Sequence, residues 1–146
     1  MQISEILANK GKDIFATRPK DTVYDAIKIM ADKNVGALLV MDGDTLCGII
    51  SERDYRNKVI LKGRRSQETN VEEIMTSNVY CIGPSETVDA CLSIMTERKI
   101  RHLPVLDDHK KVLGVISIGD LVKAVISKQQ VEIMTLQKYI SGEYPA

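Results

Sequence analysis

The sequence predicts an α/β (α+β) fold in which two copies of one β-α-β-β-α unit pack sheet to sheet around a pseudo-two-fold axis. The first observation is that the 146-residue chain repeats itself at an offset of 65 positions, which becomes 66 after a one-residue insertion in a turn. The second is that both copies show the same order of strand and helix signals. The matched pairs include Pro19 and Pro84, Thr22 and Thr87, Met30 and Met95, Val40 and Val105, Gly48 and Gly114, Ser51 and Ser117, and Asp54 and Asp120.

Each unit is expected to begin with a short strand and a helix. Apolar strands are predicted at residues 14–16 and 79–82, and a turn that contains proline follows each of them. Thr22 and Thr87 are placed to cap the helices that come next. Apolar residues then recur at i, i+3, i+4 and i+7, which is one face of a helix. These residues are Val23, Ala26, Ile27 and Met30 in the first copy and Val88, Cys91, Leu92 and Met95 in the second.

A hairpin and a second helix complete each unit. The hairpin strands are predicted at residues 37–41 and 47–50, and then at 103–106 and 112–116. The closing helices are predicted at about 53–61 and 119–128. We therefore divide the chain into a first unit with its lead-in at 1–62, a linker at 63–70, a second unit at 71–130, and a C-terminal helix and tail at 131–146. The tail helix is expected to end at Gly142 and to pack on the body or on a partner.

Composition excludes several classes of function. Lys plus Arg and Asp plus Glu both number 20, so no overall charge attracts nucleic acid or an acidic membrane. The longest apolar runs are far shorter than the roughly 20 residues of a membrane span. The three cysteines, Cys47, Cys81 and Cys91, show no zinc-binding spacing and are expected to be reduced core residues. We therefore expect a cytoplasmic protein without metal, nucleic acid or membrane partners.

The repeated runs resemble the tandem CBS (cystathionine-β-synthase) domain pair, or Bateman module. The resemblance rests on Gly36-Ala-Leu-Leu-Val40 and Arg101-His-Leu-Pro-Val105, and on the endings Gly48-Ile-Ile-Ser-Glu-Arg-Asp54 and Gly114-Val-Ile-Ser-Ile-Gly-Asp120. It covers nearly the whole chain and implies a stand-alone regulatory CBS-domain protein. It also implies an adenine nucleotide, AMP, ADP, ATP or NAD, as a ligand rather than a catalytic cofactor.

The Ser-x-x-Asp motif of each unit can be interpreted in two ways. It occurs as Ser51 with Asp54 and as Ser117 with Asp120. A serine followed three residues later by an acid forms a capping box at a helix start. The same carboxylate can accept hydrogen bonds from two vicinal ribose hydroxyls. The resemblance implies that the aspartate binds ribose in a site completed by strand residues of the other copy. The two roles are compatible.

Carried over position by position, the resemblance implies two ligand sites. The first site comprises Ser51, Arg53, Asp54, Val79, Tyr80, Ile100, Arg101, His102 and Pro104. The second site comprises Ile14, Phe15, Val35, Ala37, Leu38, Ser117, Gly119 and Asp120. Each apolar member could equally be ordinary core, although Tyr80 and Phe15 hold equivalent positions and could stack on a base.

Phosphates require cations, and the two sites differ in the cations they offer. Arg53 and Arg101 have Gly119 and Gly36 as their equivalents. The second site thus lacks an arginine at Gly36, and it lacks a proline at Leu39, so the sequence leaves its occupancy open. Arg101 could instead lie in a solvated loop, and His102 could be a packed polar residue. A basic stretch could reach a phosphate or form a solvated surface; it consists of Arg56, Lys58, Lys62, Arg64 and Arg65.

The leading hypothesis is a ligand-sensing regulatory module that acts on an unidentified protein through conformational linkage. The resemblance implies that it is a homodimer. The alternative is an interaction or scaffold unit whose site binds no ligand. No nucleophile-base pair, metal cluster or Gly-rich phosphate loop supports an enzyme.

Overall fold

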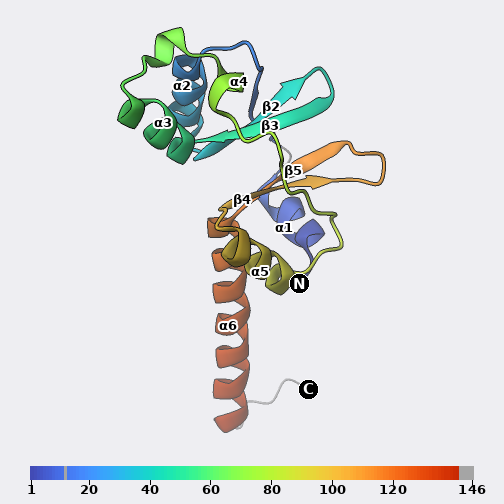
Figure 1. Ribbon diagram of the computed structural model, residues 1–146. Coiled ribbons are helices and arrows are strands. Elements are labelled where there is room, and N and C mark those ends of the chain that lie inside the picture. Colours follow the sequence, from blue (N-terminus) through green and yellow to red (C-terminus); the bar gives the residue numbers. More distant parts are fainter. Residues whose placement is uncertain (12, 142–146) are drawn as a thin grey trace.

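Residues 1–11 and 13–141 are described by the computed structural model shown in Figure 1. Two short 3₁₀ turns, Ile60–Lys62 and Ser66–Glu68, lie in the connection between the repeats. The helices and strands in chain order are α1 (Ile3–Lys10), β1 (Ala16–Thr17), α2 (Val23–Lys33), β2 (Ala37–Asp42), β3 (Thr45–Ser51), α3 (Glu52–Lys58), α4 (Val71–Ile74), α5 (Val88–Arg98), β4 (His102–Leu106), β5 (Val112–Ser117) and α6 (Ile118–Ile140).

The helices α2 and α5 begin where the sequence predicts. The Thr22 hydroxyl accepts the Asp25 amide at 3.2 Å, and the Thr87 hydroxyl accepts the Ala90 amide at 3.1 Å. Both helices end at a residue in the left-handed conformation, Asn34 and Lys99, each with φ of 54°. Their predicted apolar faces are buried, except that Ile27 and Leu92 pack at the edges of the two cores.

Two antiparallel hairpins lie between the helices of the two repeats (Figure 1). β2 pairs with β3, and β4 pairs with β5. Both hairpins carry an irregularity in register at the same place, between Val40 and Met41 and between Val105 and Leu106. Helices α2, α3 and α4 lie beyond one hairpin, whereas α1, α5 and α6 lie beyond the other. This is the mixed α/β arrangement that the repeat predicts.

The first strand of each unit is shorter than predicted. β1 covers only Ala16–Thr17, in parallel pairing with β2, and the predicted strand at 79–82 is reduced to one bridge between Ile82 and Val105. In the first repeat, the Leu39 amide donates to the Phe15 carbonyl at 3.3 Å. The equivalent of Leu39 is Pro104, which has no N–H to donate. The ladder of the second repeat therefore cannot extend back toward residue 80.

The two lead-in segments are exchanged between the repeats. Ile3 and Ile6 of α1 are buried in the core of the second repeat, whereas Val71 and Ile74 of α4 are buried in the core of the first. Matching backbone hydrogen bonds hold them. The amide of Ile3 donates to the Glu86 carbonyl at 2.9 Å, and the amide of Val71 donates to the Asp21 carbonyl at 2.8 Å. Chain order places α1 with the first unit, but each repeat completes its core with the segment that precedes the other.

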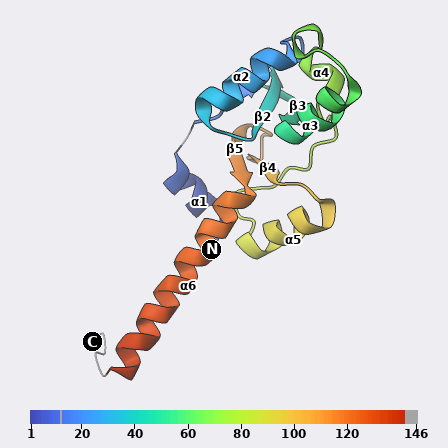
Figure 2. The same cartoon turned by 90° about the vertical axis from the view of Figure 1, so that its left-hand side faces the viewer.

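Helix α6 continues well beyond the predicted closing helix of the second unit. It runs without interruption from Ile118 to Ile140 and projects away from the hairpins, as Figures 1 and 2 show. The predicted helix end at Gly142 lies outside the described residues. No helix in the described part of the chain is long and apolar enough to cross a membrane.

Candidate functional site

A cavity of about 630 Å³ lies between the two repeats. The first repeat contributes the end of β3 and the start of α3, and the second contributes the segment before Ile82 and the connection from α5 to β4. All residues predicted for the first site line this cavity except Pro104, which is buried in β4. Those lining residues are Ser51, Arg53, Asp54, Val79, Tyr80, Ile100, Arg101 and His102.

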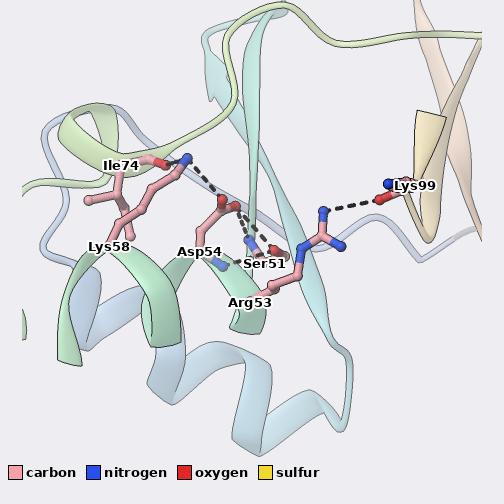
Figure 3. Close-up of polar contacts among 6 residues, drawn as sticks. All are labelled: Ser51, Arg53, Asp54, Lys58, Ile74 and Lys99. Carbon is pink, nitrogen blue, oxygen red and sulfur yellow. Dashed lines mark hydrogen bonds and ion pairs between the residues drawn. The ribbon is translucent and has the colours of Figure 1, made fainter. Parts of the chain in front are cut away.

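Asp54 is held at the cavity by a capping box at the start of α3 (Figure 3). The Ser51 amide donates to Asp54 Oδ2 at 3.0 Å, and the Asp54 amide donates to Ser51 Oγ at 3.3 Å. Lys58 Nζ lies 3.0 Å from Asp54 Oδ1 and donates to the Ile74 carbonyl at 2.8 Å. The capping reading is therefore correct, and it also fixes a carboxylate that lines the cavity.

Cations dominate the charge around the cavity. The lining includes the carboxylates Glu52 and Asp54 and a larger set of guanidinium groups, Arg53, Arg56, Arg98 and Arg101. Arg53 reaches across to the second repeat, where its Nη2 donates to the Lys99 carbonyl at 3.1 Å (Figure 3). Guanidinium groups suit phosphate oxygens because they are always charged and offer paired donors.

The aromatic ring in the cavity already has a cation on one face. The Arg98 guanidinium carbon lies 4.0 Å from the centroid of the Tyr80 ring. The same arrangement recurs in the first repeat, where Lys33 Nζ lies 5.6 Å from the Phe15 ring. Tyr80 can therefore stack on a base with only one of its faces unless Arg98 moves.

His102 is a partly buried titratable group that lines the cavity. Burial lowers the pKa of the imidazole below its ordinary value of 6.5, and the charges of Lys10 and Arg101 lower it further while Asp120 opposes them. His102 also lies 3.7 Å from the point where a Cβ on Gly36 would stand. The side chain is therefore a packed polar group at the boundary between the repeats as well as a cavity-lining residue.

The second site is built differently from the first. Leu38 is 1% exposed in the core of the first repeat, and Phe15 and Val35 pack against that core. Ile14 is exposed and Ala37 is half-buried. Ser117, Gly119 and Asp120 form the start of α6, with the same capping box as the first site. The Leu38 side chain belongs to the core, as does that of its equivalent Leu103, which is 0% exposed, so its part in a ligand site stays a prediction.

Asp120 pairs with a lysine of α1, Lys10, whereas Asp54 pairs with Lys58 of its own helix. Lys10 Nζ donates to Asp120 Oδ2 at 2.8 Å and to the Val115 carbonyl at 2.7 Å. Burial alone would raise the pKa of Asp120, but hydrogen bonds from Lys10 and Ser117 lower it below its ordinary value. The second aspartate is therefore an ionised group that already has a cationic partner.

Sequence reasoning missed Arg98 and Lys10. Arg98 could have been found from the repeat, because the offset of 65 pairs it with Lys33 just as it pairs Tyr80 with Phe15. Lys10 gives no such signal, because only the exchange of lead-in segments brings α1 to Asp120. No group of three or more potential metal ligands occurs within residues 1–11 and 13–141.

Comparison with known proteins agrees with this architecture. The CBS domain family matches the chain twice, at residues 3–60 and 71–127. The chain belongs to the CBS domain family and carries its domain as a tandem pair. A relative from Arabidopsis thaliana, the CBS domain-containing protein CBSX3, mitochondrial, is 41% identical over 151 residues, which cover 97% of this chain and 73% of the relative.

Two solved structures show the same fold. A putative signal-transduction protein with CBS domains from Burkholderia ambifaria is 52% identical and has a TM-score of 0.85 over 88% of this chain and 96% of that chain. The CBS domain pair of protein MJ0100, in complex with 5′-methylthioadenosine and S-adenosyl-L-methionine, is 27% identical with a TM-score of 0.78, over 88% of this chain and 98% of that chain. That relative binds adenosine-containing ligands.

Proposed function

We propose that the chain is a non-catalytic regulatory module that binds an adenine nucleotide in the cavity between its two CBS domains. The observation that carries the proposal is the cavity itself, in which Asp54 and a group of arginines from both repeats face one space of about 630 Å³. A volume of this size falls within the range of small-molecule sites. The adenosine ligands of the MJ0100 domain pair support the same ligand class.

Each part of a nucleotide has a suitable partner in the cavity. The carboxylate of Asp54 can accept a ribose hydroxyl, because Ser51 and Lys58 use only part of its capacity of about four lone-pair directions. Val79 and Ile100 offer apolar surface to the base, and Tyr80 offers one ring face. The arginines can hold phosphates. An excess of arginines over carboxylates favours a ligand with more than one phosphate, ADP, ATP or NAD, over adenosine ligands without phosphate.

The regulatory mechanism is linkage between the ligand and the arrangement of the repeats. A nucleotide that bonds to both repeats stabilises the arrangement in which both sets of contacts are made. Arg53 already links the repeats through its hydrogen bond to the Lys99 carbonyl. A phosphate that binds the Arg53 guanidinium would therefore alter this hydrogen bond between the repeats. A partner protein that prefers one arrangement then senses the nucleotide. Control of an unidentified partner protein, and cytoplasmic residence, remain predictions from the sequence.

Calorimetric titration with AMP, ADP, ATP, NAD and S-adenosylmethionine tests the proposal. We expect saturable binding of at least one of them, with a stoichiometry of one per chain. Absence of binding to all of them would favour the alternative, an interaction or scaffold module that needs no nucleotide.

Paired alanine variants identify the site. Asp54→Ala should weaken binding about 10- to 150-fold, the equivalent of one hydrogen bond to a charged group. Asp120→Ala is the matched control, because it removes the same capping box from the other repeat but no group that lines the cavity. Equal losses in the two variants would argue against this cavity as the nucleotide site.

A further inference from the structure

The second half of helix α6 is not buried by the body of the molecule. Leu121 is fully buried in the second core, and Ala124 and Val125 pack against that core. Every described residue from 126 to 141 is exposed. Figures 1 and 2 show this segment standing away from both repeats. An isolated helix of about 12–15 residues is only marginally stable in water, so this segment needs a further partner.

An apolar stripe runs along the whole of α6. From Val122 to Ile140, the residues of this stripe follow one another at alternating intervals of four and three positions. This is the heptad spacing of a coiled-coil seam. Ile126, Ile133 and Ile140 form one row and Val122, Gln129 and Leu136 form the other. The aliphatic members are between 45% and 82% exposed. A spacing of 3.5 residues fits a second helix, because it keeps one seam facing the partner along the full length.

The seam is suited to pairing with an identical copy. In a parallel, in-register pair each isoleucine meets the same isoleucine, and the Gln129 amide meets an equal amide that can both donate and accept. The flanking pairs in this register, Glu132 with Gln137 and Lys123 with Ile118, bring no like charges together. At about 100° per residue, the seam lies roughly a quarter of a turn from the face that packs on the second core. Only its first part lies close to the body, where Gln129 lines a hollow with Met1, Thr87 and Asp89.

We propose that α6 forms a parallel two-stranded coiled coil with α6 of a second copy of this chain, along the seam from Val122 to Ile140. Ile133→Asp places a charge in the seam and should weaken self-association about 100-fold or more. Val131→Asp is the matched control, because Val131 is 63% exposed on the opposite side of the same helix. Sedimentation equilibrium from about 1 to 100 µM would measure both.

The expected result is a dimer of the unmodified chain and of Val131→Asp, and a monomer of Ile133→Asp over most of the range. A Gln129→Cys variant should also form an interchain disulfide under mild oxidation, because identical seam positions meet in parallel register. A monomeric unmodified chain, or a dimer that Ile133→Asp leaves unchanged, would overturn the proposal. Dissociation by both aspartate variants alike would also overturn it.

A second inference concerns the site around Asp120 and rests on the proposed nucleotide function. In the first repeat, the backbone of Ile49 exchanges two hydrogen bonds with Thr76, at 3.0 and 2.9 Å. The equivalent carbonyl in the second repeat, that of Val115, accepts instead from the Lys10 side chain. Aligning the lead-in segments pairs Lys10 with Asn78, which lines the first cavity.

We infer that Lys10 takes the place of a nucleotide at the second site, so that the unmodified chain binds one nucleotide and not two. Lys10→Met, which keeps the length of the side chain and removes its charge, should raise the calorimetric stoichiometry from one to two. Lys20→Met is the matched control, because Lys20 pairs with Glu72 away from the cavity and should leave the stoichiometry at one.

The double variant Asp54→Ala, Lys10→Met separates this inference from the proposed function. It should regain the binding that Asp54→Ala loses, through the second site alone. Two nucleotides on the unmodified chain, or one on Lys10→Met, would overturn the inference while leaving the proposed function intact. Absence of all binding to the unmodified chain would instead remove the proposed function on which it rests.

Discussion

Gly48 and Gly114 are equivalent residues whose replacement by alanine should have very different effects. A Cβ on Gly48 would lie 2.7 Å from the Thr76 carbonyl oxygen and 2.9 Å from Met75 Sδ. A Cβ on Gly114 would lie 2.7 Å from Leu7 Cδ2, the far end of a flexible side chain. At Gly48 the new Cβ would meet a backbone atom, the Thr76 carbonyl oxygen. Thr76 also forms the β-bridge with Ile49 that holds the exchanged lead-in segment in place.

The magnitude follows from these contacts. Overpacking at Gly48 costs about 1–3 kcal/mol, and distortion of the two hydrogen bonds of the bridge adds about 1 kcal/mol. We therefore expect Gly48→Ala to lower the free energy of unfolding by about 2–4 kcal/mol, or the midpoint temperature by roughly 5–15 °C. Gly114→Ala should cost about 1 kcal/mol or less, because Leu7 can rotate away.

Urea unfolding followed by circular dichroism would measure both variants, with calorimetry for the midpoint temperatures. The matched pair controls for the loss of glycine itself, because both residues hold the same place in their hairpins. If Gly48→Ala were as stable as the unmodified chain, or Gly114→Ala the less stable of the two, the packing argument for the exchanged segments would be wrong.

Three further predictions concern titratable groups. Since burial lowers the pKa of His102, the unfolded chain binds its proton first, and the free energy of unfolding should fall as the pH drops below about 6.5. His102→Gln should flatten that fall in urea titrations from pH 7.5 to 5.5; an unchanged slope would contradict it. The lowered pKa of Asp120 stabilises the fold above about pH 4, and this stability is lost in acid, so the stability advantage over Asp120→Asn should shrink from pH 5 to pH 3. Burial, with a contribution from Glu86, raises the pKa of Cys91 to about 11. Ellman's reagent should therefore label Cys91 only after unfolding, and Cys91→Ser should leave the number of thiols labelled in the native protein unchanged.

The fold class and much of the first site could be predicted because their signals are local and occur twice. The threonine caps of α2 and α5 and the capping boxes at Ser51 and Ser117 depend on residues three apart in the chain. The helical faces depend on spacings of three and four residues. A single copy of such signals is weak, but their recurrence at a fixed offset identified the repeat and its two aspartates.

Patterns in the sequence alone do not reveal which lead-in segment completes which core. Ile3 and Val71 look alike as lead-in residues, and only the packed structure exchanges them between the repeats. That exchange carries Lys10 to Asp120 and Thr76 to Ile49, so Asp120 has a lysine partner from α1 whereas Asp54 has Lys58 of its own helix. The stacking of Arg98 on Tyr80 likewise depends on how α5 packs. These contacts join residues far apart in sequence, whose proximity is decided by burial of apolar surface rather than by any local pattern.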